Sequence, residues 1–544
     1  MATEKSIFSN EDAHVERRGS IQDVQRAFSV DASTDVAKFN EAHAFDSIED
    51  TTPGTFVWVC AAATAIGGML FGYDTGVISG VLVVIGDDLN HRPLSDTDKE
   101  LITTLCAAGA FIGAIVAGIT ADKFGRKPAT WFASVLFTIG AIIQATSYTI
   151  AQMSVGRLLI GLGVGSASMI VPLYIAEISP ARFRGRMISI DMIFLGTGSV
   201  LAYAMDAAFQ HVAHGWRYMV GIGAVPSILL GVFLFWCPES PRQLMYHNKR
   251  DACFKVLRQV YPNATETQVN TKLLSIEYGV SQAKALEEEM TVTKSLKTLF
   301  FIPANLRACI AACGLMFFQQ FCGFNTLMYY SSTLFAIVGF SNPIAVGTVV
   351  AGVNWIFTVL SIFVIDRIGR RRLLLWSMWG MPLCLALAAI VFKWIPIDLH
   401  TLELTTDHVG WPAYIVLVSM ILFVAFYAFG LGCVPWQANE FLPMEVRAMG
   451  TMMINLFNWG PNIVVSSTFL SMMKGITPSG TFGFYAILCF LGWLFVYFCF
   501  PEASNMNLEE IRNVFEHGFG VKYAEKWREQ RKHAIKETRR GERV

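Results

Sequence analysis

Residues 57–85 read VWVCAAATAIGGMLFGYDTGVISGVLVVI, an apolar run that carries one charged side chain, Asp74. A helix needs about 20 apolar residues to cross a bilayer, so this run is long enough to span a membrane. An ionised carboxylate in the hydrocarbon costs roughly 2.5–3.5 kcal/mol, and a chain that places one there usually supplies a cation, a water-filled cavity or a proton. Each of these is typical of a protein that moves something across a membrane.

The composition of the whole chain also indicates a membrane protein. Of its 544 residues, 53% are hydrophobic and 15% are charged, whereas a soluble domain carries about 25% charged residues. The formal net charge is zero, so nothing favours a nucleic-acid partner. The 11 Cys include no C-x-x-C motif and the 10 His lie in tails or near loop ends, so we expect no metal site.

Apolar runs of spanning length recur along the chain and predict an all-α membrane protein with twelve transmembrane helices. A polar, charged stretch from Pro238 to about Pro303 separates the sixth run from the seventh. The runs cover roughly residues 57–85, 101–121, 129–148, 152–174, 187–207, 217–237, 308–335, 344–365, 373–394, 411–438, 449–473 and 481–500.

The distribution of basic residues predicts the orientation, because cytoplasmic loops carry an excess of Lys and Arg. Basic residues follow the even-numbered runs: Lys123, Arg126, Lys127, Arg182, Arg184, Arg186, Arg367, Arg370, Arg371, Arg372 and Arg447. The opposite side is acidic: Asp87, Asp88, Asp96, Asp98, Asp398, Glu403 and Asp407. Both tails are therefore expected in the cytoplasm.

The chain also repeats itself. Glu177 and Arg184 recur as Glu440 and Arg447, with the same offset of 263 residues (440 − 177 and 447 − 184). Two further motifs recur, Pro238-Glu239 as Pro501-Glu502 and Asp122-x-x-Gly125-Arg126-Lys127 as Asp366-x-x-Gly369-Arg370-Arg371. Matching motifs in the same order indicate a parallel repeat of two six-helix halves, with a substrate site between them near the membrane midplane.

This repeat predicts five parts of the chain. They are an N-terminal cytoplasmic tail (1–54), a first six-helix half (55–237), a cytoplasmic linker with surface helices (238–304), a second six-helix half (305–500) and a C-terminal cytoplasmic tail (501–544).

Several motifs resemble those of the sugar porter family of the major facilitator superfamily. They are Gly72-Tyr73-Asp74-Thr75-Gly76, Gly156-Arg157-Leu158, Pro238-Glu239-Ser240-Pro241-Arg242, Gln319-Gln320-Phe321-x-Gly323-x-Asn325 and Val434-Pro435-Trp436. The stretches 325–329 and 476–482 resemble the fungal myo-inositol permeases in particular. The resemblance implies a major facilitator fold in the plasma membrane and a secondary transporter that works by alternating access, not an enzyme.

Asp74 and Arg157 are the candidates for proton coupling. A low dielectric favours the neutral carboxylic acid, whereas a nearby guanidinium favours the carboxylate, so a change in their pairing would let Asp74 take up or release a proton. Proton-coupled members of the family resemble this chain in having Asp at this position, whereas facilitative animal members have Asn. The alternative is a static ion pair that joins the first helix to the fourth.

The amides Gln319, Gln320 and Asn325 lie loosely on one side of the seventh run and can both donate to and accept from hydroxyls. The resemblance adds further polyol-contact positions: Asn354, Trp436, Asn458 and Asn462. The alternatives are hydrogen bonds between helices for the amides and core packing for Trp436.

The fifth run departs from the family pattern. Aligned from Arg184, the two positions where sugar porters commonly have Gln fall on Met192 and Ser199, and Asp191 precedes the first of them. Asp191 either binds a substrate hydroxyl or pairs between helices. These departures leave open a hexose, another polyol or a less polar metabolite as the substrate.

The repeated charges predict a cytoplasmic gate that ties the halves together when the cavity faces outward. We expect four pairs, Asp122 with Arg126, Glu177 with Arg184, Asp366 with Arg370 and Glu440 with Arg447. The alternative is that the basic residues only set the topology.

We therefore expect a monomeric transporter that imports a cyclic polyol, most simply myo-inositol, with a proton. Its partners would be this small molecule, the proton and the lipid bilayer, and no cofactor is implied. The alternatives are a facilitative uniporter of hexoses or polyols and a nutrient sensor built on the transporter fold.

Overall fold

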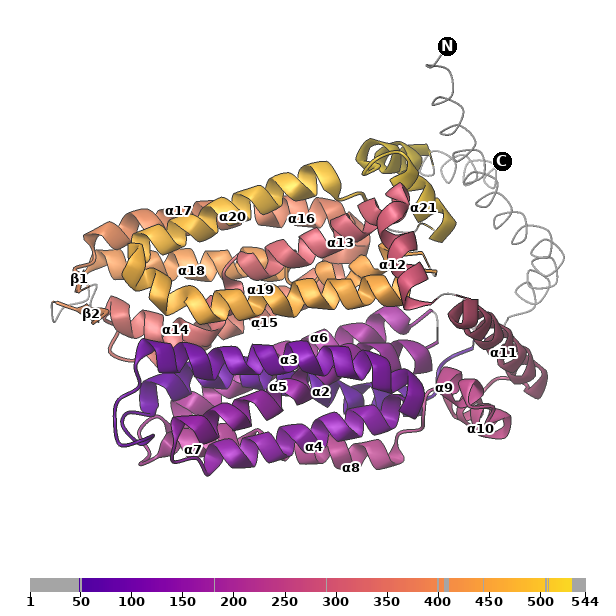
Figure 1. Cartoon of the computed structure of the whole chain (residues 1–544), viewed down its shortest axis with the longest axis horizontal. Helices are drawn as coiled ribbons and strands as arrows, with labels where there is room; N and C mark the ends of the chain where they lie inside the picture. The colour runs from indigo at the N-terminus through magenta and orange to yellow at the C-terminus, as the bar shows by residue number, and fades with distance from the viewer. Residues whose placement is uncertain are drawn as a thin grey trace, which may run out of the picture.

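The computed structural model is an elongated bundle of long helices with shorter helices gathered at one end (Figure 1). The structure describes Ile48 and residues 51–180, 182–289, 291–398, 401–405, 410–443, 445–503, 506 and 508–530. The predicted N-terminal tail falls largely outside this part of the chain, whereas most of the predicted C-terminal tail lies within it.

A first group of long helices is formed by residues 55–236 and lies along one side of the bundle (Figure 1). Its members are α2 (Thr55–Val84), α3 (Asp96–Phe124), α4 (Arg126–Ala145), α5 (Ile150–Ile178), α6 (Arg184–Phe209), α7 (Gly215–Ile222) and α8 (Ala224–Trp236).

A second group lies along the other side. Its members are α13 (Pro303–Phe321), α14 (Phe324–Val338), α15 (Pro343–Ile368), α16 (Arg370–Met378), α17 (Gly380–Val391), η2 (Phe392–Trp394), α18 (Trp411–Phe429), η3 (Pro435–Phe441), α19 (Arg447–Gly475) and α20 (Thr477–Cys499). A small antiparallel hairpin of β1 (Ile397–Asp398) and β2 (Glu403–Leu404) pairs Ile397 with Leu404 and Asp398 with Glu403.

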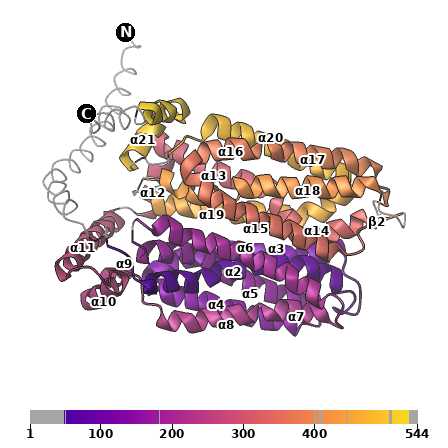
Figure 2. The ribbon, with the colours of Figure 1, turned by 180° about the vertical axis from the view of Figure 1, so that it is seen from behind.

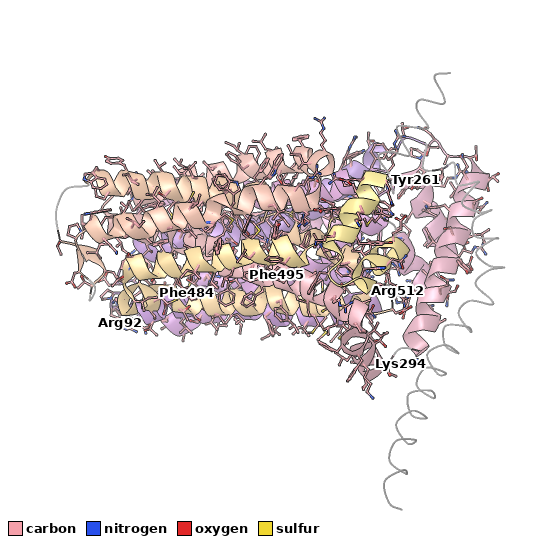
Figure 3. The ribbon with its side chains drawn as sticks, turned by 90° about the horizontal axis from the view of Figure 1, so that it is seen from above. Arg92, Tyr261, Lys294, Phe484, Phe495 and Arg512 are labelled. Carbon is pink, nitrogen blue, oxygen red and sulfur yellow. The ribbon has the colours of Figure 1, made fainter. Side chains whose placement is uncertain are left out.

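The two ends of the bundle differ. The helices of the linker and α21 lie at one of them, called here the linker end: α9 (Pro241–Tyr246), α10 (Arg250–Val260), α11 (Glu266–Glu289), α12 (Val292–Phe301) and α21 (Leu508–Glu516). The opposite end carries β1 and β2 and is called the hairpin end. In Figure 3, Arg92 and Phe484 lie toward the hairpin end and Lys294 and Arg512 at the linker end.

The predicted all-α membrane class is confirmed. Within the described residues, 11 helical segments are long and apolar enough to cross a membrane. The predicted run 449–473 forms α19, which is long enough to span but more polar, because it carries Asn455, Asn458 and Asn462. Those amides matter for the site described below.

The repeated motif at the linker end has a repeated structure. The Glu239 carboxylate accepts hydrogen bonds from the backbone N–H groups of Arg126 (3.0 Å) and Lys127 (3.2 Å) and so caps the N-terminus of α4. The Glu502 carboxylate accepts from the N–H groups of Arg370 (3.3 Å) and Arg371 (3.1 Å) and so caps α16. A helix N-terminus carries unpaired N–H groups and a partial positive charge, which a carboxylate satisfies.

A glycine precedes each of these two helices, because the capping carboxylate lies close to the backbone there. Gly125 has φ +109° and Gly369 has φ +96°, and a Cβ atom at either position would lie 2.5 Å from an oxygen of the capping carboxylate. Only glycine allows both this backbone conformation and this close approach. The sequence repeat therefore corresponds to two copies of one helix-capping arrangement.

The two helix groups meet along a few helices. Helix α3 packs against α19, α6 packs against α15, and α14 packs against α2. Figure 2 shows α6 and α15 at the boundary between the groups. This boundary is where polar side chains from both groups can face a common space.

The predicted seventh span is broken in two. Helix α13 ends at Phe321, and α14 begins at Phe324 after Gly323, whose φ is +85°. A Cβ atom on Gly323 would lie 3.0 Å from the ring of Tyr485. The break turns the amides at the end of α13 and the start of α14 toward the centre of the bundle.

Candidate functional site

A polar cavity of about 90 Å³ lies between the two helix groups. It brings together all seven residues that were predicted to contact the substrate: Gln319, Gln320, Asn325, Asn354, Trp436, Asn458 and Asn462. Phe71 and Thr75 of α2 and Met192 and Ser199 of α6 line the opposite wall. Both groups therefore contribute to one site.

Gln320 is the centre of an amide network in this cavity. Its Nε2 donates to Asn458 Oδ1 (2.6 Å), and its Oε1 accepts from Asn325 Nδ2 (2.5 Å) and from Asn462 Nδ2 (3.0 Å). Gln320, Asn458 and Asn462 are each less than 5% exposed. Three helices, α13, α14 and α19, are thus linked through one side chain.

Gln319 is held differently from its neighbour. Its Nε2 donates to the carbonyl oxygens of Leu431 (3.0 Å) and Gly432 (3.3 Å), in the irregular segment after α18. Its Oε1 is buried and accepts no hydrogen bond within the described part of the chain. This oxygen is an acceptor available to a hydroxyl donor.

The walls around these amides are aromatic. Trp436 is half-buried, and Phe324 stacks on Tyr427 with ring centroids 3.8 Å apart. Phe71 of the first group and Trp459 of the second lie 5.5 Å apart across the boundary. A cavity with apolar faces and several convergent amides is typical of a binding site for a small polar solute.

Asp74 and Arg157 form a buried ion pair beside the cavity. Arg157 Nη1 lies 2.5 Å from Asp74 Oδ1, and the two side chains are 1% and 6% exposed. Arg157 Nε also donates to the carbonyl of Ile102 (3.2 Å). The pair joins α2, α3 and α5, and the predicted partners do meet.

Two further residues complete this cluster, and the sequence analysis did not single them out for it. The Cys106 thiol donates to Asp74 Oδ2 (2.9 Å). The Tyr329 hydroxyl donates to Asn462 Oδ1 (3.4 Å) and lies close enough to Arg157 and Asp74 to interact electrostatically with both. Tyr329 thus connects the amide network to the ion pair, a link between distant segments that no local pattern in the sequence reveals.

The residues that depart from the family pattern have different positions. Met192 and Ser199 line the cavity, and the Ser199 hydroxyl donates to the carbonyl of Gly72 (3.0 Å). Asp191 lies outside the cavity lining, packed against Gly68 of α2, and its Oδ1 is buried without a hydrogen bond in the described part of the chain.

Helix α6 carries a second buried carboxylate, Asp206, which the sequence analysis overlooked. Asp206 Oδ2 accepts from the backbone N–H of Gly80 (3.1 Å), and its side chain is fully buried. Asp206 lies in the same apolar run as Asp191, so a charged residue within an apolar run, the signal that identified Asp74, is present here too.

Glu177 and Glu440 at the linker end pair with basic residues other than the expected Arg184 and Arg447, whereas the expected pairs Asp122 with Arg126 and Asp366 with Arg370 stay predictions. Arg126 pairs with Glu177 (3.1 Å), and Arg370 pairs with Glu440. Each pair lies within one helix group. Arg184 is exposed and Arg447 donates to the carbonyl of Leu442, whereas the side chains of Asp122 and Asp366 lie outside the described part of the structure. The expected pairings followed proximity in sequence, but helix packing brings together residues from different segments.

Polar contacts between the two groups gather toward the hairpin end. Glu100 of α3 accepts hydrogen bonds from the N–H (2.8 Å) and the hydroxyl (2.7 Å) of Ser471 on α19. One turn away, Asp96 pairs with Lys474. The Tyr203 hydroxyl bonds to Ser331 (2.6 Å). These contacts hold the two groups together on the hairpin side of the cavity.

Within the described residues, no group of three or more His, Cys, Asp and Glu side chains is arranged to hold a metal ion.

Comparison with known protein families gives one match over most of the chain. Residues 60–515 match the sequence model of a family described as sugar (and other) transporter. Myo-inositol transporter 1 of Cryptococcus neoformans var. grubii is 44% identical over 479 residues, which cover 88% of this chain and 84% of the relative. Myo-inositol transporter 2 of Schizosaccharomyces pombe is 44% identical over 485 residues, which cover 89% and 86%.

Solved structures of similar fold include that of the xylose transporter XylE from E. coli in an inward open conformation. It superposes with a TM-score of 0.68 at 26% identity, covering 84% of this chain and 99% of that one. The structure of the proton:xylose symporter XylE bound to 6-bromo-6-deoxy-D-glucose gives a TM-score of 0.67 at 26% identity, covering 85% and 99%.

Proposed function

The chain belongs to the sugar transporter family of the major facilitator superfamily, and from this premise we propose that it imports a cyclic polyol, first of all myo-inositol, together with a proton. The family and the likeness to fungal myo-inositol permeases that the motifs predicted are confirmed. So is the major facilitator fold.

The observation that best supports the substrate is the amide network around Gln320, in a chain 44% identical to transporters named for myo-inositol. Amides donate and accept, so ring hydroxyls can replace the bonds that Gln320 makes to Asn325, Asn458 and Asn462 with bonds of similar strength. Trp436 offers an aromatic face to the apolar side of the ring.

Gln319, Asn354, Met192 and Ser199 complete the proposed contact surface. Gln319 Oε1 supplies a free acceptor. Met192 and Ser199 bring a thioether and a hydroxyl to positions where the family resemblance predicts Gln, so they would adjust which polyol fits. Asp191 would act on specificity through the packing of α6 against α2.

Proton coupling would use Asp74. With Asp74 ionised, Arg157 holds the carboxylate and joins α5 to α2. A proton taken up on Asp74 removes the negative charge, weakens the pair and frees α2 to move relative to α5. Each positive charge that enters along the membrane field gains about 2.3 kcal/mol per 100 mV, enough to accumulate a neutral solute.

The linker end would face the cytoplasm, because Lys123, Arg126, Lys127 and Arg370 lie there. The protein would then lie in the plasma membrane as a monomer with both tails inside. The contacts of Glu100 and Asp96 would close the outer side, and the charges around Arg126 and Arg370 would lock the inner side in the outward-facing state.

Uptake of labelled myo-inositol into cells that lack their own inositol transport tests the substrate. We expect saturable accumulation, together with a fall in cytoplasmic pH and a rise in the pH of a weakly buffered medium when inositol is added, because each imported solute brings a proton inside. Absence of uptake by protein at the cell surface would contradict the substrate assignment.

The coupling is tested with Asp74→Asn, which should still equilibrate inositol but neither accumulate it nor acidify the cytoplasm. Asp206→Asn is a matched control, because Asp206 is also a buried carboxylate but bonds to a backbone N–H instead of Arg157. Unchanged accumulation in Asp74→Asn would instead support a uniporter.

A further inference from the structure

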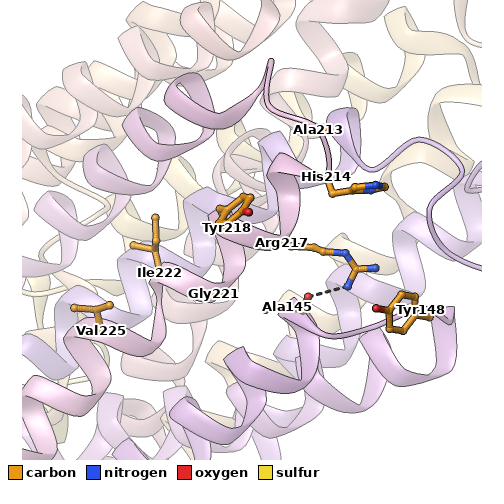
Figure 4. Close-up of a pocket in the computed structure, with 9 residues that line it drawn as sticks. All are labelled: Ala145, Tyr148, Ala213, His214, Arg217, Tyr218, Gly221, Ile222 and Val225. Carbon is orange, nitrogen blue, oxygen red and sulfur yellow. Dashed lines mark hydrogen bonds between the residues drawn. The ribbon is translucent and has the colours of Figure 1, made fainter.

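A second cavity lies beside α7 (Figure 4), a helix near the hairpin end of the first group (Figure 1). It has a volume of about 670 Å³ and lies between the end of α4 and the start of α7. Ala145 and Gly221 form its floor, and a Cβ atom on Gly221 would meet only that of Ala145, at 3.4 Å. Two small residues therefore keep a groove open between neighbouring helices.

The polar end of this groove carries a cation that no described carboxylate pairs with. Arg217 Nη1 donates to the carbonyl of Ala145 (2.8 Å), as Figure 4 shows. The guanidinium lies 4.6 Å from the ring centre of Tyr148 and 4.4 Å from that of Trp216. Stacking fixes the guanidinium and leaves N–H donors free for an anion.

The nearest carboxylate is occupied elsewhere. Asp88 Oδ2 bonds to His214 Nδ1 (2.6 Å) and to Trp216 Nε1 (2.6 Å). Asp88 therefore holds the loop before α7. Arg217 lies near enough to Asp88 to interact with it electrostatically, but it forms no salt bridge with that carboxylate and donates to Ala145 instead. A second anion would complement the positive charge on this side.

The exposed side chains around the groove locate it relative to the bilayer. Tyr148 is 70% exposed, and at the same end of the second group Trp394, Trp411 and Tyr414 are 57–59% exposed. Exposed Trp and Tyr rings mark the level of the lipid headgroups. About two helical turns after Arg217, Val225 is 55% exposed, as expected for a surface that faces acyl chains.

We propose that this groove binds a phospholipid, with its phosphate on Arg217 and an acyl chain along Ile222 and Val225 over the floor of Ala145 and Gly221. A guanidinium matches phosphate geometry through two parallel N–H donors. The site does not depend on the identity of the transported solute.

The test uses purified full-length protein, stripped of lipid and titrated with dioleoyl phosphatidylcholine, with bound lipid counted by native mass spectrometry. Arg217→Gln removes the charge and should raise the lipid concentration for half occupancy by about tenfold or more. Gly221→Leu fills the groove, leaves Arg217 unchanged and should abolish this binding event. Gly483→Leu is the matched control, because a Cβ atom on Gly483 meets nothing within 4 Å.

Thermal unfolding and solute uptake confirm that each variant is folded. Inorganic phosphate at millimolar concentration should neither bind nor displace the lipid. Lipid occupancy equal to wild type in both folded variants would overturn the proposal. So would displacement by inorganic phosphate, which would make the groove an anion site without a lipid.

Discussion

Asn458 and Asn455 show how two amides on one helix take different roles. Asn458 lines the central cavity and accepts from Gln320 (2.6 Å), whereas Asn455 donates to the carbonyl of Thr451 in its own helix (3.1 Å). Only a residue in the cavity can exchange its hydrogen bond for one to a solute. The pair therefore separates a binding role from a structural one.

We expect Asn458→Ala to raise the KM for inositol by about 3- to 10-fold, because a lost hydrogen bond to an uncharged group costs roughly 0.5–1.5 kcal/mol. Asn455→Ala should leave KM unchanged. Initial uptake rates at several inositol concentrations, corrected for surface expression, measure both. Equal effects of the two substitutions would argue against a direct contact of Asn458.

Asp88 allows a prediction about pH. Burial opposes ionisation of Asp88, but hydrogen bonds from His214 and Trp216 outweigh it and hold the pKa of the carboxyl below its usual value. A carboxyl whose pKa is lower in the folded state contributes stability above its unfolded pKa, and this contribution is lost as the pH falls through the folded pKa.

Wild type should therefore unfold at a higher temperature than Asp88→Asn at pH 5, and the margin should shrink as the pH falls below about 4. The effect should be small, roughly 0.2–1 kcal/mol, because the pair is near the surface. Unfolding curves of both proteins across this range give the answer, and a margin that persists unchanged to pH 3 would show that the charge of Asp88 does not stabilise the fold.

At the scale of the elements, the break between α13 and α14 orients the amides. Gly323 holds φ +85° beside the ring of Tyr485, and Gln320 and Asn325 lie on either side of it. Their bond across the break (2.5 Å) requires both helices to keep their directions. The broken helix is thus part of the binding site.

Gly323→Ala should lower the unfolding temperature and reduce uptake, because a left-handed conformation costs a residue with a side chain about 1–2 kcal/mol and the new methyl would press on Tyr485. Gly483→Ala, in the open position on α20, serves as the control. Thermal unfolding of the two purified variants measures the cost, and equal stability would mean that the break does not depend on glycine.

Helices and cavity residues were predictable from the sequence to different degrees. Apolar runs predicted the spans, since the bilayer imposes their length. The amides and the family resemblance also predicted Gln320 and Asn458 as site residues. They did not predict the hydrogen bond between the two, because the residues are more than a hundred positions apart in the sequence. Cys106 left no signal, since a thiol in an apolar helix usually packs as a small hydrophobic group.

The gate shows the same limit more clearly. The sequence identified Arg126, Glu177, Arg370 and Glu440 as a repeated set of charges, yet the observed partners join α4 to α5 and α16 to η3. The partner of an ion pair depends on which helices cross, and the spacing along one segment does not contain that information. Side-chain chemistry was predictable here, whereas tertiary pairing was not.

At the scale of the whole molecule, contacts at the hairpin end hold the two groups together. Glu100 binds Ser471, and Asp96 pairs with Lys474. Alternating access requires these contacts to separate when the cavity opens on this side. A covalent crosslink that replaces one of these contacts should therefore stop the transport cycle.

Asp96→Cys with Lys474→Cys, joined by a short bifunctional thiol reagent, should lose most of its uptake. The native cysteines should react little with the reagent, because ten are buried and Cys499 is half-buried. A cleavable reagent should restore uptake when it is cut, and each single variant should be unaffected by it. Full uptake by the crosslinked protein would mean that this end does not open.

The two carboxylate caps have a consequence for how the chain is put together. Glu239, just after α8, caps α4, and Glu502, just after α20, caps α16. Each cap therefore comes from the chain that directly follows the same helix group, and neither comes from the other group. We therefore expect that a break in the chain between α11 and α12 leaves each group able to fold. A gene split between α11 and α12, with both fragments made in the same cell, should yield two polypeptides that assemble into a working carrier.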